Sequence, residues 1–179
     1  MVVERFGDAD SFKIKANPDT QVSFGRNYVA AVTGDYPTLL DIDTAYGRDF
    51  SVEWMIPHLT ALALYTGARN LTKPQLMELA RVIAAEYRNL KVTEVLLFFY
   101  RFKTGRYGKF YGSVDPMVVT CAMREFMGER SSIIAEHEAE QERMRMEMAA
   151  NDPDAMTKEE YDEIRMLERM YEMQTGNNV

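Results

Sequence analysis

Apolar residues recur every three or four positions through most of the chain after residue 48, which is the period of one face of an α-helix. The first such run extends from Val52 to Thr66 and contains Pro57, which removes one backbone donor. Two alternatives are open there: the proline kinks the helix, or the helix begins only near Met55. Residues 1–48 lack this period and are broken by turn-forming pairs such as Asn17–Pro18. The pattern predicts an all-α protein, a small helical module preceded by an irregular N-terminal arm at 1–48.

Two further helices of this module have recognisable boundaries. Thr72 and Gln75 have the spacing of a capping box, in which two side chains satisfy the first backbone donors of a helix. Thr93 is the expected cap of the next helix, and Gly105 its expected end. The residues expected to face inward from these helices are Leu76, Leu79, Ala80, Ile83, Tyr87, Val95, Leu96, Phe99 and Phe102.

The last part of the chain is predicted to form long, acidic helices. Asp115 followed by Pro116 is a strong helix start, and that helix is expected to continue past Gly128. Thr157 and Glu160 form a second capping-box pattern that opens a final helix. Its apolar side is expected to hold Tyr161, Ile164, Leu167 and Tyr171. We therefore predict a helical core module at 49–130 and an acidic, Met-rich helical hairpin or extension at 131–179.

The net charge of −7 is unevenly distributed along the chain. Residues 1–70 carry a net charge of −3, residues 71–130 carry +4, and residues 131–179 carry −8. Two interpretations remain open for the acidic end: a pair of solvated helices, or a tail that shields the basic middle or offers a second partner surface.

Targeting features are sparse. The N-terminus shows no secretory leader, and the longest strongly apolar stretch, residues 54–65, is shorter than the roughly 20 residues that cross a bilayer. One cysteine, Cys121, cannot form an internal disulfide. These features predict a protein of a reducing cytoplasm that does not insert into a membrane.

Residues 98–111 mix four cations with seven aromatic residues, and we call residues 101–111 the basic–aromatic segment. Cations attract phosphates and aromatic faces stack on bases, so the segment is a candidate site for single-stranded nucleic acid or for a protein partner. Its candidate binding residues are Arg101, Lys103, Arg106, Tyr107, Lys109, Phe110 and Tyr111. A structural role stays open, in which the rings pack on the core and Asp115 pairs with Arg106 or Lys109.

Patterns typical of enzymes are absent from the sequence. Neither a phosphate-binding GxxxxGK[ST] loop nor a GxGxxG pattern occurs, and no nucleophile lies beside an obvious base. The two histidines, His58 and His137, are far apart, and the pattern around His137 does not make the Glu-x-x-His pair of a helical metal site. Cys121 is expected to be a small core residue. We expect no enzymatic activity, no metal and no cofactor.

Residues 52–130 resemble an uncharacterised family of small helical proteins from phages and mobile elements of gut bacteria. The resemblance rests on Ala84-Ala85-Glu86-Tyr87-Arg88, on Leu97-Phe98-Phe99-Tyr100-Arg101-Phe102-Lys103, and on Gly105-Arg106-Tyr107-Gly108-Lys109-Phe110-Tyr111. It implies a helical module in a phage or mobile-element context, and it transfers no activity. The order of the helices is also faintly similar to the small helical domains of phage helicase loaders, an architectural analogy.

Two hypotheses about function follow. The first is a non-enzymatic accessory protein in DNA replication, which binds nucleic acid or a replication protein through the basic–aromatic segment. The alternative is a phage structural or assembly protein, or an oligomeric protein-binding adapter, that uses the Met-rich C-terminal helices for self-association or partner binding.

Overall fold

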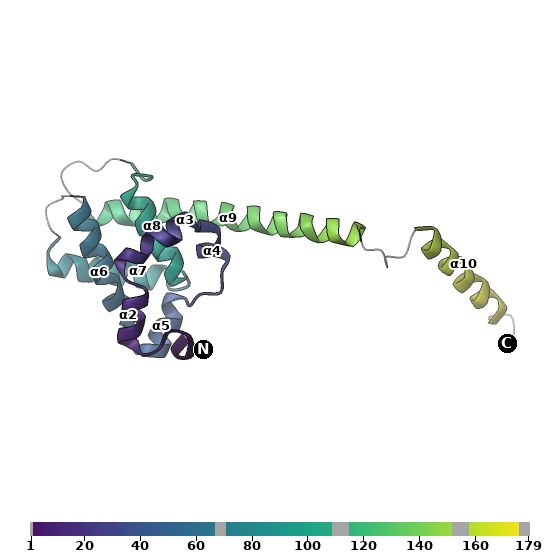
Figure 1. Ribbon diagram of the computed structural model, residues 1–179, viewed down its shortest axis with the longest axis horizontal. Coiled ribbons are helices and arrows are strands. Elements are labelled where there is room, and N and C mark those ends of the chain that lie inside the picture. Colours follow the sequence, from purple (N-terminus) through teal and green to yellow (C-terminus); the bar gives the residue numbers. More distant parts are fainter. Residues whose placement is uncertain (1, 67–70, 109–114, 152–157, 176–179) are drawn as a thin grey trace. The chain divides into compact units, whose positions relative to one another are not determined.

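The computed structural model describes residues 2–66, 71–108, 115–151 and 158–175, and these residues confirm the predicted all-α fold (Figure 1). Thr38 and Lys91 make an isolated antiparallel bridge, and no strand forms within these ranges. The helical elements are α1 (Val2–Phe6), α2 (Ala9–Lys15), the 3₁₀ helix η1 (Pro18–Thr20), α3 (Gln21–Arg26), α4 (Tyr28–Thr33), α5 (Leu39–Tyr46), α6 (Phe50–Tyr65), α7 (Lys73–Glu86), α8 (Val92–Lys103), α9 (Pro116–Ala150) and α10 (Lys158–Thr175).

The prediction of an irregular arm at 1–48 is wrong, because these residues form α1 to α5 and η1. Each of these helices has at most eight residues, too few for the apolar period to be visible in the sequence. Asn17, which suggested a turn, is the N-cap of η1, and its Oδ1 accepts from the Asp19 amide at 2.9 Å. Other polar residues cap neighbouring helices: Asp8 Oδ1 accepts from the Ser11 amide at 2.8 Å, and Thr38 and Asp41 form a reciprocal capping box.

The N-terminal helices are part of the core. Phe12 of α2 is fully buried, and its ring lies 5.4 to 6.2 Å from the rings of Phe6, Tyr46, Phe50 and Trp54. Residues Met1–His137 form one compact unit, and Glu138–Val179 form a second. The first unit therefore includes the N-terminal helices together with α6, α7, α8 and the first part of α9.

The central helix of the first unit is α8, which packs against α3, α4 and α6. Most of its side chains are buried, including Phe99 and Phe102 as predicted. The prediction that Thr93 caps this helix is wrong, because the helix begins at Val92 and Thr93 is buried within it. The Thr93 hydroxyl donates to the Ala31 carbonyl at 2.7 Å and so joins α8 to α4.

Helices α6, α7 and α9 follow their predictions closely. Helix α6 begins at Phe50 and includes Pro57, so a start near Met55 is wrong. The predicted capping box of Thr72 and Gln75 opens α7. Asp115 Oδ1 accepts from the Met117 amide at 2.8 Å at the start of α9. This helix is 35 residues long and continues past Gly128, as predicted. The buried face of α9 holds Val119, Ala122, Met123, Phe126 and Ile133. Cys121 lies outside this face and is exposed, which corrects its predicted core position.

The second unit contains the end of α9 and all of α10. Both helices of the expected hairpin are therefore present. The Thr157 cap lies outside the described residues, and packing between the two helices stays a prediction. Every side chain that the structure describes in α10, from Lys158 to Tyr171, is exposed.

Candidate functional site

The basic–aromatic segment converges on one carboxylate, that of Glu129 on α9. Arg101 Nη1 lies 2.5 Å from Glu129 Oε2, and Arg106 Nε lies 2.5 Å from Oε1. The Tyr107 hydroxyl donates to Oε2 at 3.3 Å. One carboxylate thus accepts from three donors, and we call these four residues the Glu129 cluster.

The local fold explains how three residues close in sequence reach the same acceptor. Arg101 lies in the last turn of α8, and Gly105 with φ of 78° reverses the chain after that helix. The Arg106 amide then donates to the Arg101 carbonyl at 3.1 Å. The Tyr107 ring stacks on buried Phe98 at 5.7 Å between centroids. This packing fixes the hydroxyl of Tyr107 beside Glu129.

Two members of the Glu129 cluster, Tyr107 and Arg106, have a raised pKa. Burial is the main cause of the raised pKa of Tyr107, and the neighbouring charge of Glu129 adds to it. The hydrogen bond from Arg106 to Glu129 raises the pKa of that guanidinium further above its usual range. Tyr107 is therefore a neutral hydrogen-bond donor, and both arginines are cations that share one anion.

Lys103 lies on a different polar chain, which passes into the core. Its Nζ donates to Gln21 Oε1 at 2.8 Å, and Gln21 Nε2 lies 3.0 Å from His58 Nδ1. The ammonium group of Lys103 can only donate hydrogen bonds. Gln21 therefore presents its oxygen to Lys103 and its NH₂ to His58. His58 Nδ1 is then the acceptor, and His58 Nε2 donates to the Ala16 carbonyl at 3.1 Å. This arrangement requires a neutral imidazole.

The neutral state of His58 predicts a loss of stability in acid. Burial lowers the pKa of His58 from 6.5 to about 4; the bond to the Ala16 carbonyl opposes this shift, and the charge of Lys103 adds to it. Burial lowers the pKa of Lys103, and the negative charge of Asp19 opposes this shift. Between pH 6.5 and about 4 the unfolded chain binds this proton and the folded chain does not. The free energy of unfolding should therefore fall by ~3 kcal/mol as the pH decreases through this window.

Urea unfolding at several pH values measures this effect. The His58→Gln variant removes the titrating group, so its stability should depend less steeply on pH in that window. Equal pH dependence of the two proteins would contradict the prediction, because the remaining carboxylates titrate in both.

The described candidate binding residues all contact other groups of the protein. Arg101 is 12% exposed and its guanidinium lies 5.5 Å from the Tyr28 ring centroid, whereas Arg106 is 55% exposed. Lys109, Phe110 and Tyr111 lie outside the described residues. Arg106 is therefore the described cation of the segment that is most accessible to a ligand.

A pocket of about 600 Å³ opens beside the Glu129 cluster. Its lining residues come from the α3–α4 region, α8 and its following turn, and α9: Gly25, Tyr28, Tyr100, Arg101, Thr104, Arg106, Glu129, Ser132, Ile133 and Glu136. Two arginines and two glutamates balance its formal charge. This lining gives no strong preference for an anion over a cation.

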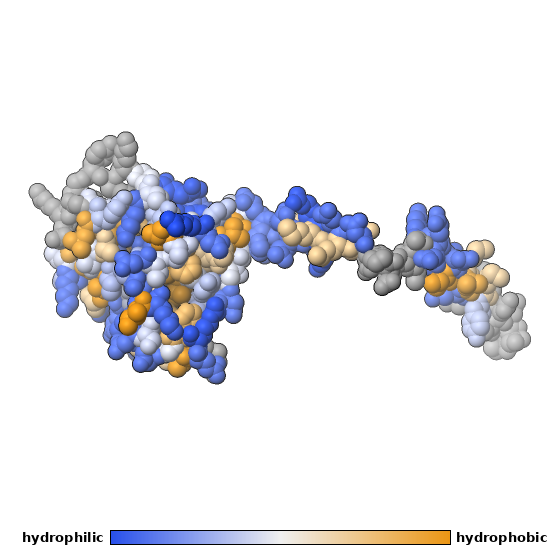
Figure 2. Space-filling view, viewed as in Figure 1, coloured by the Kyte–Doolittle hydropathy of each residue, from blue (hydrophilic) through white to orange (hydrophobic). Residues whose placement is uncertain are grey.

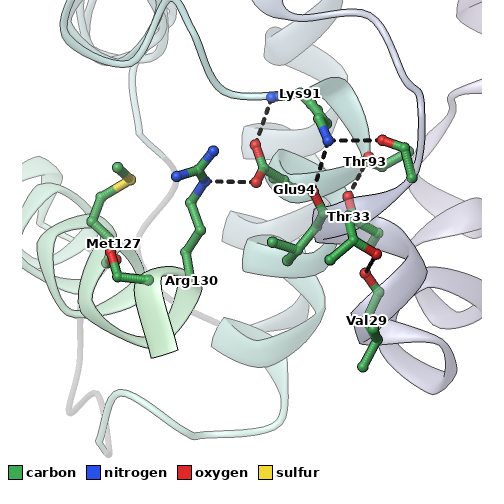
Figure 3. Close-up of polar contacts among 11 residues, drawn as sticks. Val29, Thr33, Lys91, Thr93, Glu94, Met127 and Arg130 are labelled. Atoms are coloured by element: carbon green, nitrogen blue, oxygen red, sulfur yellow. Dashed lines mark hydrogen bonds and ion pairs between the residues drawn. The ribbon is translucent and has the colours of Figure 1, made fainter. Parts of the chain in front are cut away.

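A second ion pair between α8 and α9 was not predicted from the sequence. Glu94, in the first turn of α8, is fully buried, and Arg130 Nε donates to its Oε1 at 2.6 Å (Figure 3). The Lys91 amide donates to Glu94 Oε2 at 2.8 Å, while Lys91 Nζ donates to the carbonyls of Val32 and Gly34 at the end of α4. Lys91, Glu94 and Arg130 thus join three helices.

A family model described as a family of unknown function (DUF6633) matches residues 72–172, more than half of the chain. The protein belongs to this family. The matched range holds the Glu129 cluster, the Glu94–Arg130 pair and most of α10, while Gln21 and His58 lie before it. Comparisons with curated proteins and with solved structures give no match.

Large apolar side chains are exposed in both units of this DUF6633 protein, Ile14 and Leu64 of the first unit among them. Apolar side chains of α10 lie at the surface, as Figure 2 shows in orange, and Met144, Met146 and Met148 of α9 are exposed as well.

In the described ranges, no three His, Cys, Asp or Glu side chains are placed to hold a metal ion. None of the described helices has the length and apolar content to cross a membrane.

Proposed function

We propose that this protein is a non-enzymatic accessory protein of a phage or mobile element, and that it binds a partner protein through its C-terminal helices. The observation that carries the proposal is the exposed apolar side of α10. The phage or mobile-element context is supported by the resemblance of residues 52–130 to helical proteins of such elements. In this proposal, the first unit is a stable helical scaffold and the second unit is the recognition element.

The sequence of α10 supports a binding role over a purely solvated one. Tyr161, Ile164 and Leu167 follow a spacing of three residues, which places them within a single arc of the helix. In proteins, a helix gains most of its stability by packing an apolar face rather than from its intrinsic helix propensity. A partner that covers this face would supply the missing burial.

The polar contacts of the first unit support the same assignment. Arg101 and Arg106 share Glu129, and Lys103 bonds Gln21, so three cations of the basic–aromatic segment stabilise the protein itself. Contact with nucleic acid is the competing function, and the exposed Arg106 is the observation that favours it. A charge reversal there would place a second carboxylate against Glu129, so Arg106→Gln is the appropriate variant for testing it.

Affinity capture from host extract tests the proposal with the full-length chain as bait. We expect a discrete protein that is retained by the wild type and lost with the double variant Ile164→Gln/Leu167→Gln. Met166→Gln is the matched control, because Met166 is 65% exposed, Leu167 is 61% exposed, and the two adjacent residues point to different sides of α10. Glutamine keeps both the charge and a good helix propensity.

Nuclease treatment separates the two functions. Retention of the partner after nuclease, together with its loss in the double variant, supports protein binding through α10. Loss of the partner after nuclease and in Arg106→Gln, with no effect of the α10 variant, would instead assign the protein to nucleic-acid binding. Purified partner added back to the wild type must reproduce the contact directly.

A further inference from the structure

The apolar side of α10 has a defined width and composition. Tyr161, Ile164 and Leu167 lie about 60° apart around the helix axis, so they span an arc of about 120°. All three side chains are exposed. This width matches the stripe that an amphipathic helix buries against another helix or a groove.

The end of α9 continues the same kind of surface. The residues that follow the buried face of α9 at spacings of three or four are His137, Gln141, Met144 and Met148. Ile133, still in the first unit, is buried, whereas Met144 and Met148 are exposed. Methionine side chains adapt to partners of irregular shape, so this surface can accept apolar groups of various forms.

The charge around these apolar residues restricts what can bind there. Residues 138–179 contain 5 Lys or Arg and 12 Asp or Glu, a net charge of −7. Nucleic acid and an anionic membrane surface are repelled by such a segment. A second copy would bring another −7 into the same interface, which is also unfavourable. A cationic surface is attracted.

We infer that the partner of the C-terminal helices presents an apolar strip flanked by lysine or arginine, as a basic amphipathic helix does. This inference rests on the proposed protein-binding function and specifies the chemistry of the partner. The acidic residues accelerate encounter, because opposite charges steer association at long range. Tyr161, Ile164 and Leu167 hold the complex, because burial of apolar area mainly slows dissociation.

Two synthetic helical peptides test the inference with the full-length protein. The first has leucines at helical spacing and lysines elsewhere, and the second keeps every leucine but replaces each lysine with glutamate. Fluorescence anisotropy should show binding of the Leu–Lys peptide that weakens with added salt, and much weaker binding of the Leu–Glu peptide.

Variants of α10 separate apolar recognition from simple charge attraction. The Leu167→Gln variant should bind the Leu–Lys peptide about tenfold more weakly, because one buried leucine is lost from the interface. Met166→Gln should bind as the wild type does. Equal binding by Leu167→Gln and the wild type would overturn the inference, because charge alone would then explain the affinity.

Three further results would overturn the inference. Equal affinity for the two peptides would show that the partner need not be basic. No binding of the Leu–Lys peptide, with capture from extract still dependent on Ile164 and Leu167, would overturn the partner chemistry and leave the proposed function intact. A dimer in light scattering that Leu167→Gln dissociates would identify a second copy as the partner.

Discussion

Replacing Phe12 with alanine should lower the free energy of unfolding by ~3 to 5 kcal/mol, the cost typical of removing a buried phenylalanine. Phe12 is fully buried, and its ring contacts the rings of Tyr46 and Phe50 as well as Trp54. With Phe6 of α1, these rings of α5 and α6 would line the cavity, and three helices cannot all collapse into it. Urea unfolding followed by far-ultraviolet circular dichroism measures the loss.

The control for this prediction lies two residues away. Ile14 is on the same helix and is 70% exposed, so Ile14→Ala should change the free energy of unfolding by less than about 0.5 kcal/mol. If both variants were equally stable, α2 would contribute little to the core. That result would restore the interpretation of residues 1–48 as a peripheral arm.

Replacing Glu94 with alanine should destabilise the protein by a similar amount, ~3 to 5 kcal/mol. The change removes the acceptor of Arg130 and of the Lys91 amide, and it leaves a largely buried guanidinium without its counter-ion. An uncompensated buried charge costs more than the pair itself contributes, because the charge has already lost its water. Thermal and urea unfolding measure the loss.

Two further variants define the origin of that effect. Glu125 is an exposed acid on α9, and Glu125→Ala should leave stability within about 0.5 kcal/mol of the wild type. The double variant Glu94→Leu/Arg130→Met removes both charges and should recover much of the stability lost in Glu94→Ala. If the double variant were no more stable than Glu94→Ala, the loss would come from the Lys91 contact or from packing.

The parts of the fold that were predicted from the sequence are those with local signals. The capping box at Thr72 and Gln75 and the start at Asp115 and Pro116 depend on residues within one turn, so the sequence alone locates them. The short N-terminal helices were missed because fewer than three turns do not establish a period. Thr93 was misassigned because its hydroxyl bonds Ala31, 62 positions earlier, and no local pattern shows such a contact.

The candidate site was predicted only in part, for a related reason. The composition of residues 98–111 identified a chemically distinctive segment, and Phe99 and Phe102 were correctly assigned to the core. The ion-pair partner of its arginines was not found, because Glu129 is one of many acids on a long helix. Asp115 is closer in sequence and was considered as a partner of Arg106 or Lys109 in the structural alternative, yet the fold brings Glu129 to Arg106.

The adjacent residues Glu129 and Arg130 have a consequence for where α9 of this protein can change in length. Glu129 binds Arg101 at the end of α8, and Arg130 binds Glu94 near its beginning, about 10 Å away along that helix. Inserting or deleting one residue between Phe126 and Glu129 would rotate both side chains by about 100° relative to the apolar face and break both pairs. Length changes in α9 should therefore be tolerated after Ile133 and rejected before Glu129, so the two ion pairs set the angular register of the helix.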